Sequence, residues 1–297
     1  MPDTLKLLVR FAPLVFVLLW STGFIGARFG LPHADPLTFT AIRFAIVTIV
    51  LLVIARIRNA RGPAPGLAWV HLAVSGVLIH SCFVGGVFYA IDRGVDVSIA
   101  AVITGAQPIL TAAIAATLLT ERLRRIQWLG FVIGFVGLSM VVLPSYRGGG
   151  LDALGLVACV LALIGITLGT LYQKRFPMQV DLFFGSAIQF ASAAIVCALW
   201  AFAYEQRVIE WNITVSLTMT WMCLALSVGA VSILLLLIRN DAASRVSSLF
   251  YLVPPATAVQ GYLFFDQTLN LLQCLGVAVT AAAVAMIIVD PGKSAAV

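Results

Sequence analysis

The sequence predicts an all-α integral membrane protein of ten transmembrane helices, arranged as two inverted five-helix repeats. Of its 297 residues, 62% are hydrophobic and only 10% are charged, whereas about a quarter of the residues in a soluble domain carry charge. Apolar stretches of membrane-spanning length recur along the whole chain. Similar residues also return at a constant distance of 146 positions, which indicates a duplicated unit.

A helix needs roughly 20 apolar residues to cross a bilayer. Ten stretches meet this requirement, at about residues 11–30, 36–55, 67–91, 97–119, 127–143, 154–172, 182–202, 215–237, 243–265 and 271–289. Short loops join them, so no soluble domain is expected. The first stretch follows Lys6 and Arg10 as a signal peptide would, but it matches the sixth at the common offset and should be retained.

The duplication divides the chain into a first repeat at residues 1–146 and a second at residues 147–297. The segment Ala41–Ala45 returns as Ala187–Ala191. Other pairs share one residue type at this offset: Gly23 and Gly169, Asp35 and Asp181, Arg93 and Arg239, Ser98 and Ser244, Pro108 and Pro254, Gly130 and Gly276. Five spans are an odd number, so the second repeat enters the bilayer upside down. Inverted repeats of this kind usually place a substrate site near the midplane, which favours a carrier.

The basic residues predict the orientation. With the N-terminus in the cytoplasm, most Lys and Arg residues of the loops lie on the cytoplasmic side, and the outer side receives Arg28, Arg93, Arg147 and Arg207. By the positive-inside rule, both termini are cytoplasmic in a multi-pass protein of the cell membrane, of the bacterial inner-membrane type. The net charge of +6 is thereby explained, and no nucleic-acid partner is expected.

Two ionisable residues lie within predicted spans. His80 falls near the centre of the third span and Arg43 seven residues into the second. An ionisable residue in the membrane is a functional candidate by default, as a substrate contact or coupling group for His80 and a counter-charge for a substrate carboxylate for Arg43. The alternatives are a neutral imidazole satisfied by a neighbouring helix and an arginine that snorkels to the interface.

The fourth and ninth spans carry matching stripes of small and polar residues, which suit either a cavity wall or a packing seam. Pro108 and Pro254 remove helical hydrogen bonds at equivalent points and are candidate hinges or gates. Trp20 and Tyr89 lie within spans, away from the usual interfacial belt. The candidate substrate-binding residues are Trp20, Ser21, Arg43, His80, Tyr89, Thr104, Gln107, Ser244, Ser248 and Tyr251.

Metal, cofactor and catalytic chemistry are not expected. The five cysteines are isolated in apolar stretches and form no CxxC pair. Asp35, Glu121, Asp181 and Asp266 all fall near span ends. A buried acid is the usual cation or proton site of a transporter, so the pattern leaves facilitated diffusion, or proton coupling through another group.

The segments from Ala101 to Pro108 and from Tyr251 to Pro254, with Gln127 and Gln273 after them, resemble the EamA repeat of the drug/metabolite transporter superfamily. Trp20–Gly23 and Arg43–Phe44 are also similar to that family. The resemblance covers essentially the whole chain and implies a ten-helix exporter of amino acids or related metabolites. Two positions depart from a symmetric pattern, because Glu121 is matched by Gln267 and Arg43 by Gln189.

The sequence therefore predicts a transporter, not an enzyme, that exports neutral amino acids, aromatic ones included, and similar small metabolites by alternating access. Its partners would be the small-molecule substrate and membrane lipid, with a monomer or a homodimer as the assembly. The alternatives are a nucleotide-sugar or sugar-phosphate carrier, for which one embedded arginine is too few, and an integral-membrane enzyme, for which no G-x-S-x-G partner of His80 exists. A structural scaffold would not require symmetric helix-breaking prolines.

Overall fold

The computed structural model describes residues 3–63, 66–118, 125–147, 152–176, 180–230, 233 and 250–288. Within these ranges the chain is helical, and the one β-type pairing is an isolated bridge between Ala34 and Ile209. The first sequence half contains α1 (Asp3–Gly30), η1 (Leu31–His33), α2 (Pro36–Ile57), α3 (Leu67–Gly76), η2 (Val77–Gly85), α4 (Gly86–Asp92), α5 (Val97–Gly105), α6 (Gln107–Leu118) and α7 (Arg125–Arg147). The second half contains α8 (Ala153–Arg175), α9 (Leu182–Tyr204), α10 (Ile213–Trp221), η3 (Met222–Ala230), η4 (Phe250–Leu252), α13 (Val253–Phe265) and α14 (Leu271–Ile288).

Within the described ranges, six helical segments are long and apolar enough to cross a membrane: Phe11–His33, Pro36–Ile57, Leu67–Asp92, Ala153–Arg175, Leu182–Tyr204 and Ile213–Ala230. Shorter apolar helices cover Val97–Thr111, Trp128–Leu143 and Leu271–Met286. These segments follow the predicted spans, except that the end of the predicted eighth span and the start of the ninth lie outside the described residues.

Two spans contain π-helix at equivalent positions. The third span passes from α3 through the π-helical η2 to α4, and the eighth passes from α10 into the π-helical η3. Adding 146 to the start of η2 gives residue 223, one position from the start of η3. Long π-helix is rare and is frequently found at functional sites. The fourth span is also interrupted, because α5 ends at Gly105 and α6 begins at Gln107, next to Pro108.

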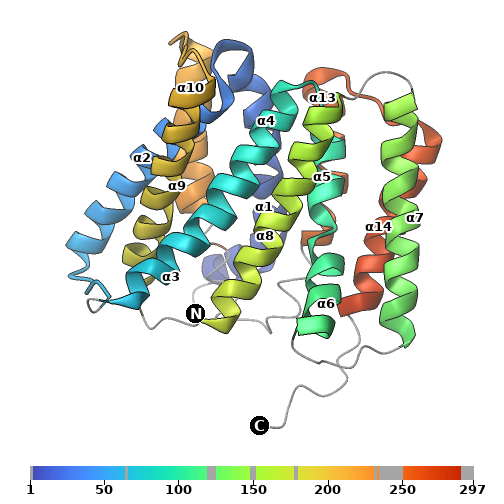
Figure 1. The fold of residues 1–297 in the computed structure, drawn as a ribbon, viewed down its shortest axis with the longest axis horizontal. Helices are drawn as coiled ribbons and strands as arrows, with labels where there is room; N and C mark the ends of the chain where they lie inside the picture. The colour runs from blue at the N-terminus through green and yellow to red at the C-terminus, as the bar shows by residue number, and fades with distance from the viewer. Residues whose placement is uncertain are drawn as a thin grey trace. The chain divides into compact units, whose positions relative to one another are not determined.

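The chain forms two compact units, and each unit takes segments from both sequence halves. Unit one comprises Met1–Ile25, Asp96–Leu151 and Gly229–Val297, and unit two comprises Gly26–Val95 and Asp152–Val228. In unit one, α5 packs on α13 and α7 on α14 (Figure 1). In unit two, α2 and α3 pack on α9, while η2 and α4 pack on α8. Two of these pairs, α2 with α9 and α7 with α14, join equivalent helices of the two halves. The helices α5 and α13 come from the equivalent fourth and ninth spans, but from different parts of them.

Contacts between α7 and α14 have the reciprocity of a two-fold arrangement. A Cβ atom added to Gly137 would lie 2.6 Å from Thr280 Oγ1, and one added to Gly134 would lie 3.4 Å from Ala283 Cβ. Gly134 is equivalent to Thr280 (134 + 146 = 280) and Gly137 to Ala283 (137 + 146 = 283). Replacing each residue by its equivalent in the other half therefore turns the Gly137–Thr280 contact into the Gly134–Ala283 contact. A two-fold axis between the two helices has this effect.

Unit two shows the same reciprocity. The α3 and α9 backbones cross at Gly76, where an added Cβ would lie 2.5 Å from Gln189 Cα. The equivalent pair, η3 and α2, cross at Cys223, whose Sγ lies 3.8 Å from the carbonyl oxygen of Arg43. Arg43 and Gln189 are 146 positions apart, and Gly76 and Cys223 are 147 apart. The crossing of α3 with α9 and the crossing of η3 with α2 therefore occur at equivalent positions of the two repeats.

Candidate functional site

A buried arginine lies in the membrane-spanning helix α2. Arg43 is 4% exposed, and its Nη2 donates a hydrogen bond of 3.3 Å to Ser227 Oγ in η3. The guanidinium carbon lies 5.6 Å from the ring centroid of Phe44 and 6.0 Å from that of Phe88. Among the described residues, Nε of Arg43 has no hydrogen-bond partner. The side chain is thus directed at η3 within unit two, surrounded by rings and one neutral hydroxyl.

The carboxylates of Glu205 and Asp35 in unit two bind elsewhere, at helix ends. Glu205 accepts hydrogen bonds from the Leu37 and Thr38 backbone, and Asp35 accepts one from the Val208 backbone. Asp181 accepts a hydrogen bond at the N-terminus of its own helix, Asp152 pairs with Arg93, and Glu210 pairs with His33. Within the part of the chain that the structure describes, no carboxylate lies within ion-pair distance of Arg43.

His80 lies in η2, beside the same aromatic rings. Its imidazole stacks on Phe190 at a centroid distance of 4.0 Å and meets Phe44 edge-on at 5.8 Å. It also lies near Gln189, the residue before Phe190. Gln189 Nε2 in turn donates to Ser75 Oγ at 3.2 Å. This set of residues is called the Arg43 cluster below, and its members are Arg43, Phe44, Ser75, His80, Phe88, Gln189, Phe190 and Ser227.

The structure therefore brings together two of the predicted site residues, Arg43 and His80. Gln189, Phe190 and Ser227 were not among the predicted site residues. Two of them could have been identified from the repeat, because Gln189 and Phe190 are the equivalents of Arg43 and Phe44 (189 − 43 = 146). Two-fold symmetric packing of α2 on α9 brings such equivalents into one cluster.

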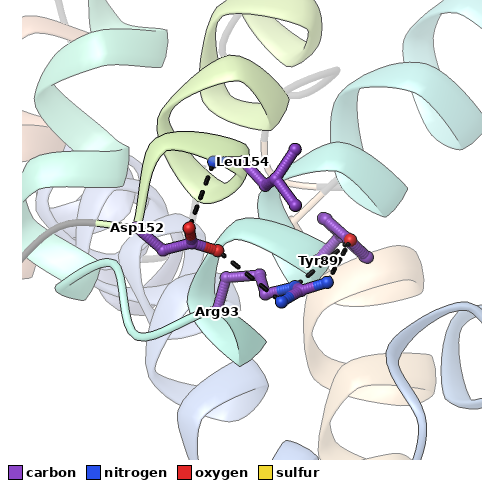
Figure 2. A network of polar contacts seen from close by, with 4 residues as sticks. All are labelled: Tyr89, Arg93, Asp152 and Leu154. Carbon is purple, nitrogen blue, oxygen red and sulfur yellow. Dashed lines mark hydrogen bonds and ion pairs between the residues drawn. The ribbon is translucent and has the colours of Figure 1, made fainter.

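Tyr89 belongs to a separate polar network at the end of α4, which Figure 2 shows. Its hydroxyl accepts hydrogen bonds from Arg93 Nε at 3.2 Å and Nη2 at 2.9 Å. Arg93 Nη1 lies 3.7 Å from Asp152 Oδ2, and Asp152 Oδ1 accepts a hydrogen bond from the Leu154 backbone at the start of α8. The hydrogen bond with Tyr89 raises the pKa of the exposed Arg93, which stays protonated. The network ties α4 to the N-terminus of α8.

In unit one, the Trp20 ring lies 5.4 Å from Phe16 and 5.2 Å from Phe250. The hydroxyls of Ser21 and Thr104 donate to carbonyls of their own helices, those of Leu18 and Ala100. These hydroxyls are therefore already satisfied in this conformation.

The candidate hinges and the remaining candidates also fall in unit one. Pro254 and Gly105 line an apolar cavity of about 10 Å³, with room for roughly one water molecule. Pro108 and Gln107 are partly buried at the start of α6. Ser244, Ser248 and the side chain of Tyr251 lie outside the described residues.

Comparison with known proteins identifies the family. The model of the EamA-like transporter family matches residues 9–143 and again residues 153–289. The chain belongs to the EamA-like transporter family. It is therefore a membrane transporter, and the predicted fold of ten helices in two inverted repeats is confirmed by this family and by the helical structure.

The relatives are distant but nearly full-length. The chain is 24% identical to the "Uncharacterized inner membrane transporter YedA" of Escherichia coli K12, over 91% of this chain and 87% of that protein. It is 22% identical to the "Uncharacterized transporter YvbV" of Bacillus subtilis, over 86% and 83%. A "Probable amino-acid metabolite efflux pump" of Salmonella typhimurium is 23% identical over 90% of each chain. One crystal structure, at 20% identity, matches 95% of this chain and 96% of its own with a TM-score of 0.64, which shows the shared fold.

Proposed function

We propose that this transporter exports neutral amino acids, aromatic ones included, and related small metabolites across a bacterial inner membrane. The observation that carries the proposal is the Arg43 cluster, which holds a cation, an imidazole, an amide and hydroxyls among aromatic rings inside membrane-spanning helices. A zwitterion with an apolar side chain needs this combination of groups. The relative named as an amino-acid metabolite efflux pump supports the same substrate class.

The proposed transport cycle is alternating access. The two inverted repeats, at residues 1–146 and 147–297, are proposed to exchange conformations, so that the site opens to one side and then to the other. Both termini are proposed to be cytoplasmic, because most basic loop residues then lie on the cytoplasmic side. The cycle contains no catalytic step.

Counterflow in proteoliposomes tests the substrate class. Purified protein is reconstituted in vesicles loaded with a neutral amino acid, and uptake of the same labelled compound is followed for a panel that includes threonine, methionine, tryptophan and phenylalanine. We expect uptake of several of these above that of protein-free vesicles. Absence of uptake for the entire amino-acid panel would rule out the proposed class.

Two arms of the same assay address the alternatives. Repeating counterflow with an imposed pH gradient separates a facilitator, whose uptake does not respond, from a proton-coupled carrier. Nucleotide sugars and sugar phosphates are included as competitors. One buried arginine is a poor match for their multiple negative charges, so these compounds should not compete.

A further inference from the structure

Resting on the proposed function, we propose that Arg43 is the residue that recognises the substrate carboxylate, and that Ser227 holds its place when no substrate is bound. The site thereby selects molecules with a free carboxylate over otherwise identical amides or amines. The contacts of the guanidinium carry this inference.

The first step is the unbalanced charge of Arg43. A guanidinium has five N–H donors in a planar fork. Within the described part of the chain, this one makes a single side-chain hydrogen bond, at 3.3 Å, to a neutral hydroxyl. Its Nε has no partner among the described residues. Burying a charge without a counter-ion is costly, and the two neighbouring rings offset only part of that cost. A ligand carboxylate, with two oxygens that match the fork, removes the imbalance.

The second step is the role of Ser227. Its hydroxyl donates to the Met222 carbonyl five residues earlier, at 3.1 Å, so its oxygen is left to accept from Arg43. This bond has a charged donor but a neutral acceptor, so it is weaker than a bond between a guanidinium and a carboxylate. A carboxylate can therefore displace Ser227 from Arg43, while Ser227 remains bound to its own helix.

The third step concerns access. Arg43 and Ser227 are 4% and 5% exposed, so the cluster is closed in this conformation. Ser227 lies in the π-helical η3, where the backbone bonds follow an i to i+5 pattern. A local change from π- to α-helix would turn the residues of η3 about the helix axis and so change where the Ser227 oxygen lies relative to Arg43. Substrate entry is proposed to use this change.

The fourth step is the asymmetry between the halves. The position equivalent to Arg43 is Gln189, whose amide binds Ser75 and lies beside His80. The cluster therefore has a charged end on α2 and a neutral end on α9. A zwitterion bound here places its carboxylate toward α2, and its ammonium group toward the neutral oxygens of α9 and α3.

The test compares phenylalanine with phenylalaninamide, which lacks the carboxylate, in proteoliposome counterflow. Wild-type protein should favour phenylalanine. Arg43→Gln should weaken phenylalanine transport by roughly 10- to 100-fold, the range expected for bonds to a charged group, and leave the amide unchanged. Arg43→Lys, which keeps the charge without the fork, should give an intermediate ratio. Arg93→Gln removes an arginine outside the cluster and should keep the wild-type ratio. An unchanged ratio in Arg43→Gln would overturn the proposal.

Ser227→Ala gives a second readout that does not depend on the Arg43 variants folding. Because this change removes the competitor for Arg43, the affinity for phenylalanine should rise by roughly 2- to 10-fold. Unchanged or weaker binding would contradict the place-holding role. A purely structural Arg43–Ser227 contact predicts lower thermal stability with no gain in affinity.

A binding measurement separates this inference from the proposed function. If the wild-type protein carries no amino acid, the proposed substrate class fails, but thermal stabilisation of the purified protein by phenylacetate against phenylacetamide still tests Arg43. Selective stabilisation by phenylacetate that is lost in Arg43→Gln supports carboxylate recognition. Equal responses to both compounds would contradict it.

Discussion

Two pairs of equivalent helices make different use of the same repeat. In unit one, α7 and α14 approach closely, because an added Cβ at Gly137 would lie 3.0 Å from the Gly276 carbonyl oxygen and one at Gly276 would lie 2.8 Å from the Gly137 carbonyl oxygen. In unit two, α2 and α9 pack around Arg43 and Gln189, with Phe44 and Phe190 in ring contact at 5.4 Å.

The comparison shows how duplication separates packing from chemistry. The α7–α14 pair brings backbone close to backbone at Gly137 and Gly276, where neither position has room for a Cβ atom. The α2–α9 pair has larger side chains, and the two copies differ at the position where one carries a charge. The α7–α14 contact differs between the copies only in small or neutral residues, whereas the cluster proposed to bind substrate differs by a charge, at Arg43 and Gln189.

The largest expected effect is the loss of the α7–α14 contact. In Gly137→Leu the new Cβ would lie 2.6 Å from Thr280 Oγ1 and 2.7 Å from the Thr280 backbone nitrogen. Because backbone atoms cannot move aside, we expect a cost of at least 1–3 kcal/mol and little folded protein by fluorescence-detected size exclusion. Gly185→Ala is the control, since its nearest neighbour would lie at 3.6 Å. A wild-type yield of Gly137→Leu would show that the close approach is not required.

A moderate effect is expected at the N-terminus of α2. Glu205 accepts hydrogen bonds from Leu37 N at 2.7 Å, Thr38 N at 2.8 Å and Thr38 Oγ1 at 2.7 Å. Removing these bonds in Glu205→Ala should cost about 1–2 kcal/mol, as for other helix caps, and lower the melting temperature of the purified protein. Glu210→Ala, which removes an exposed partner of His33, is the matched control. Equal melting temperatures for both variants would show that the cap does not stabilise unit two.

The smallest effect is expected for Tyr89→Phe. This change removes only the hydroxyl that accepts from the exposed Arg93 at the end of α4 (Figure 2). Exposed contacts of this kind contribute little to stability, so melting temperature and the KM for phenylalanine should both stay close to wild type. A clear increase in KM would instead place Tyr89 in the substrate path, as the sequence predicted, and would extend the site beyond the Arg43 cluster.

The sequence predicted the spans and the repeat well, because hydrophobic length and a constant offset are local properties of the chain. Arg43 and His80 could also be identified as candidate site residues, since ionisable residues are rare in the membrane. Their partners were not, because Ser227 lies 184 positions after Arg43 and only the packing of the helices joins them. The capping role of Glu205 similarly depends on a contact 168 positions away in sequence.

The π-helical segments could not be predicted from the sequence either. Nothing in the composition of Val77–Gly85 or Met222–Ala230 distinguishes π- from α-helix, since the two differ by one residue per hydrogen-bonded turn. The interruption of the fourth span next to Pro108 was easier to anticipate, because proline lacks the N–H that a continuous helix needs. Tyr89 was placed correctly within a helix, but its local partner Arg93 was overlooked.

The interleaving of the two units has a consequence for biosynthesis. Arg43 emerges from the ribosome well before Ser227, and unit two is complete only when the chain has been made to Val228. The translocon therefore receives a charged helix whose lasting neighbours, α9 and η3, have not yet been translated. Early insertion of this protein must be a provisional arrangement that later helices replace.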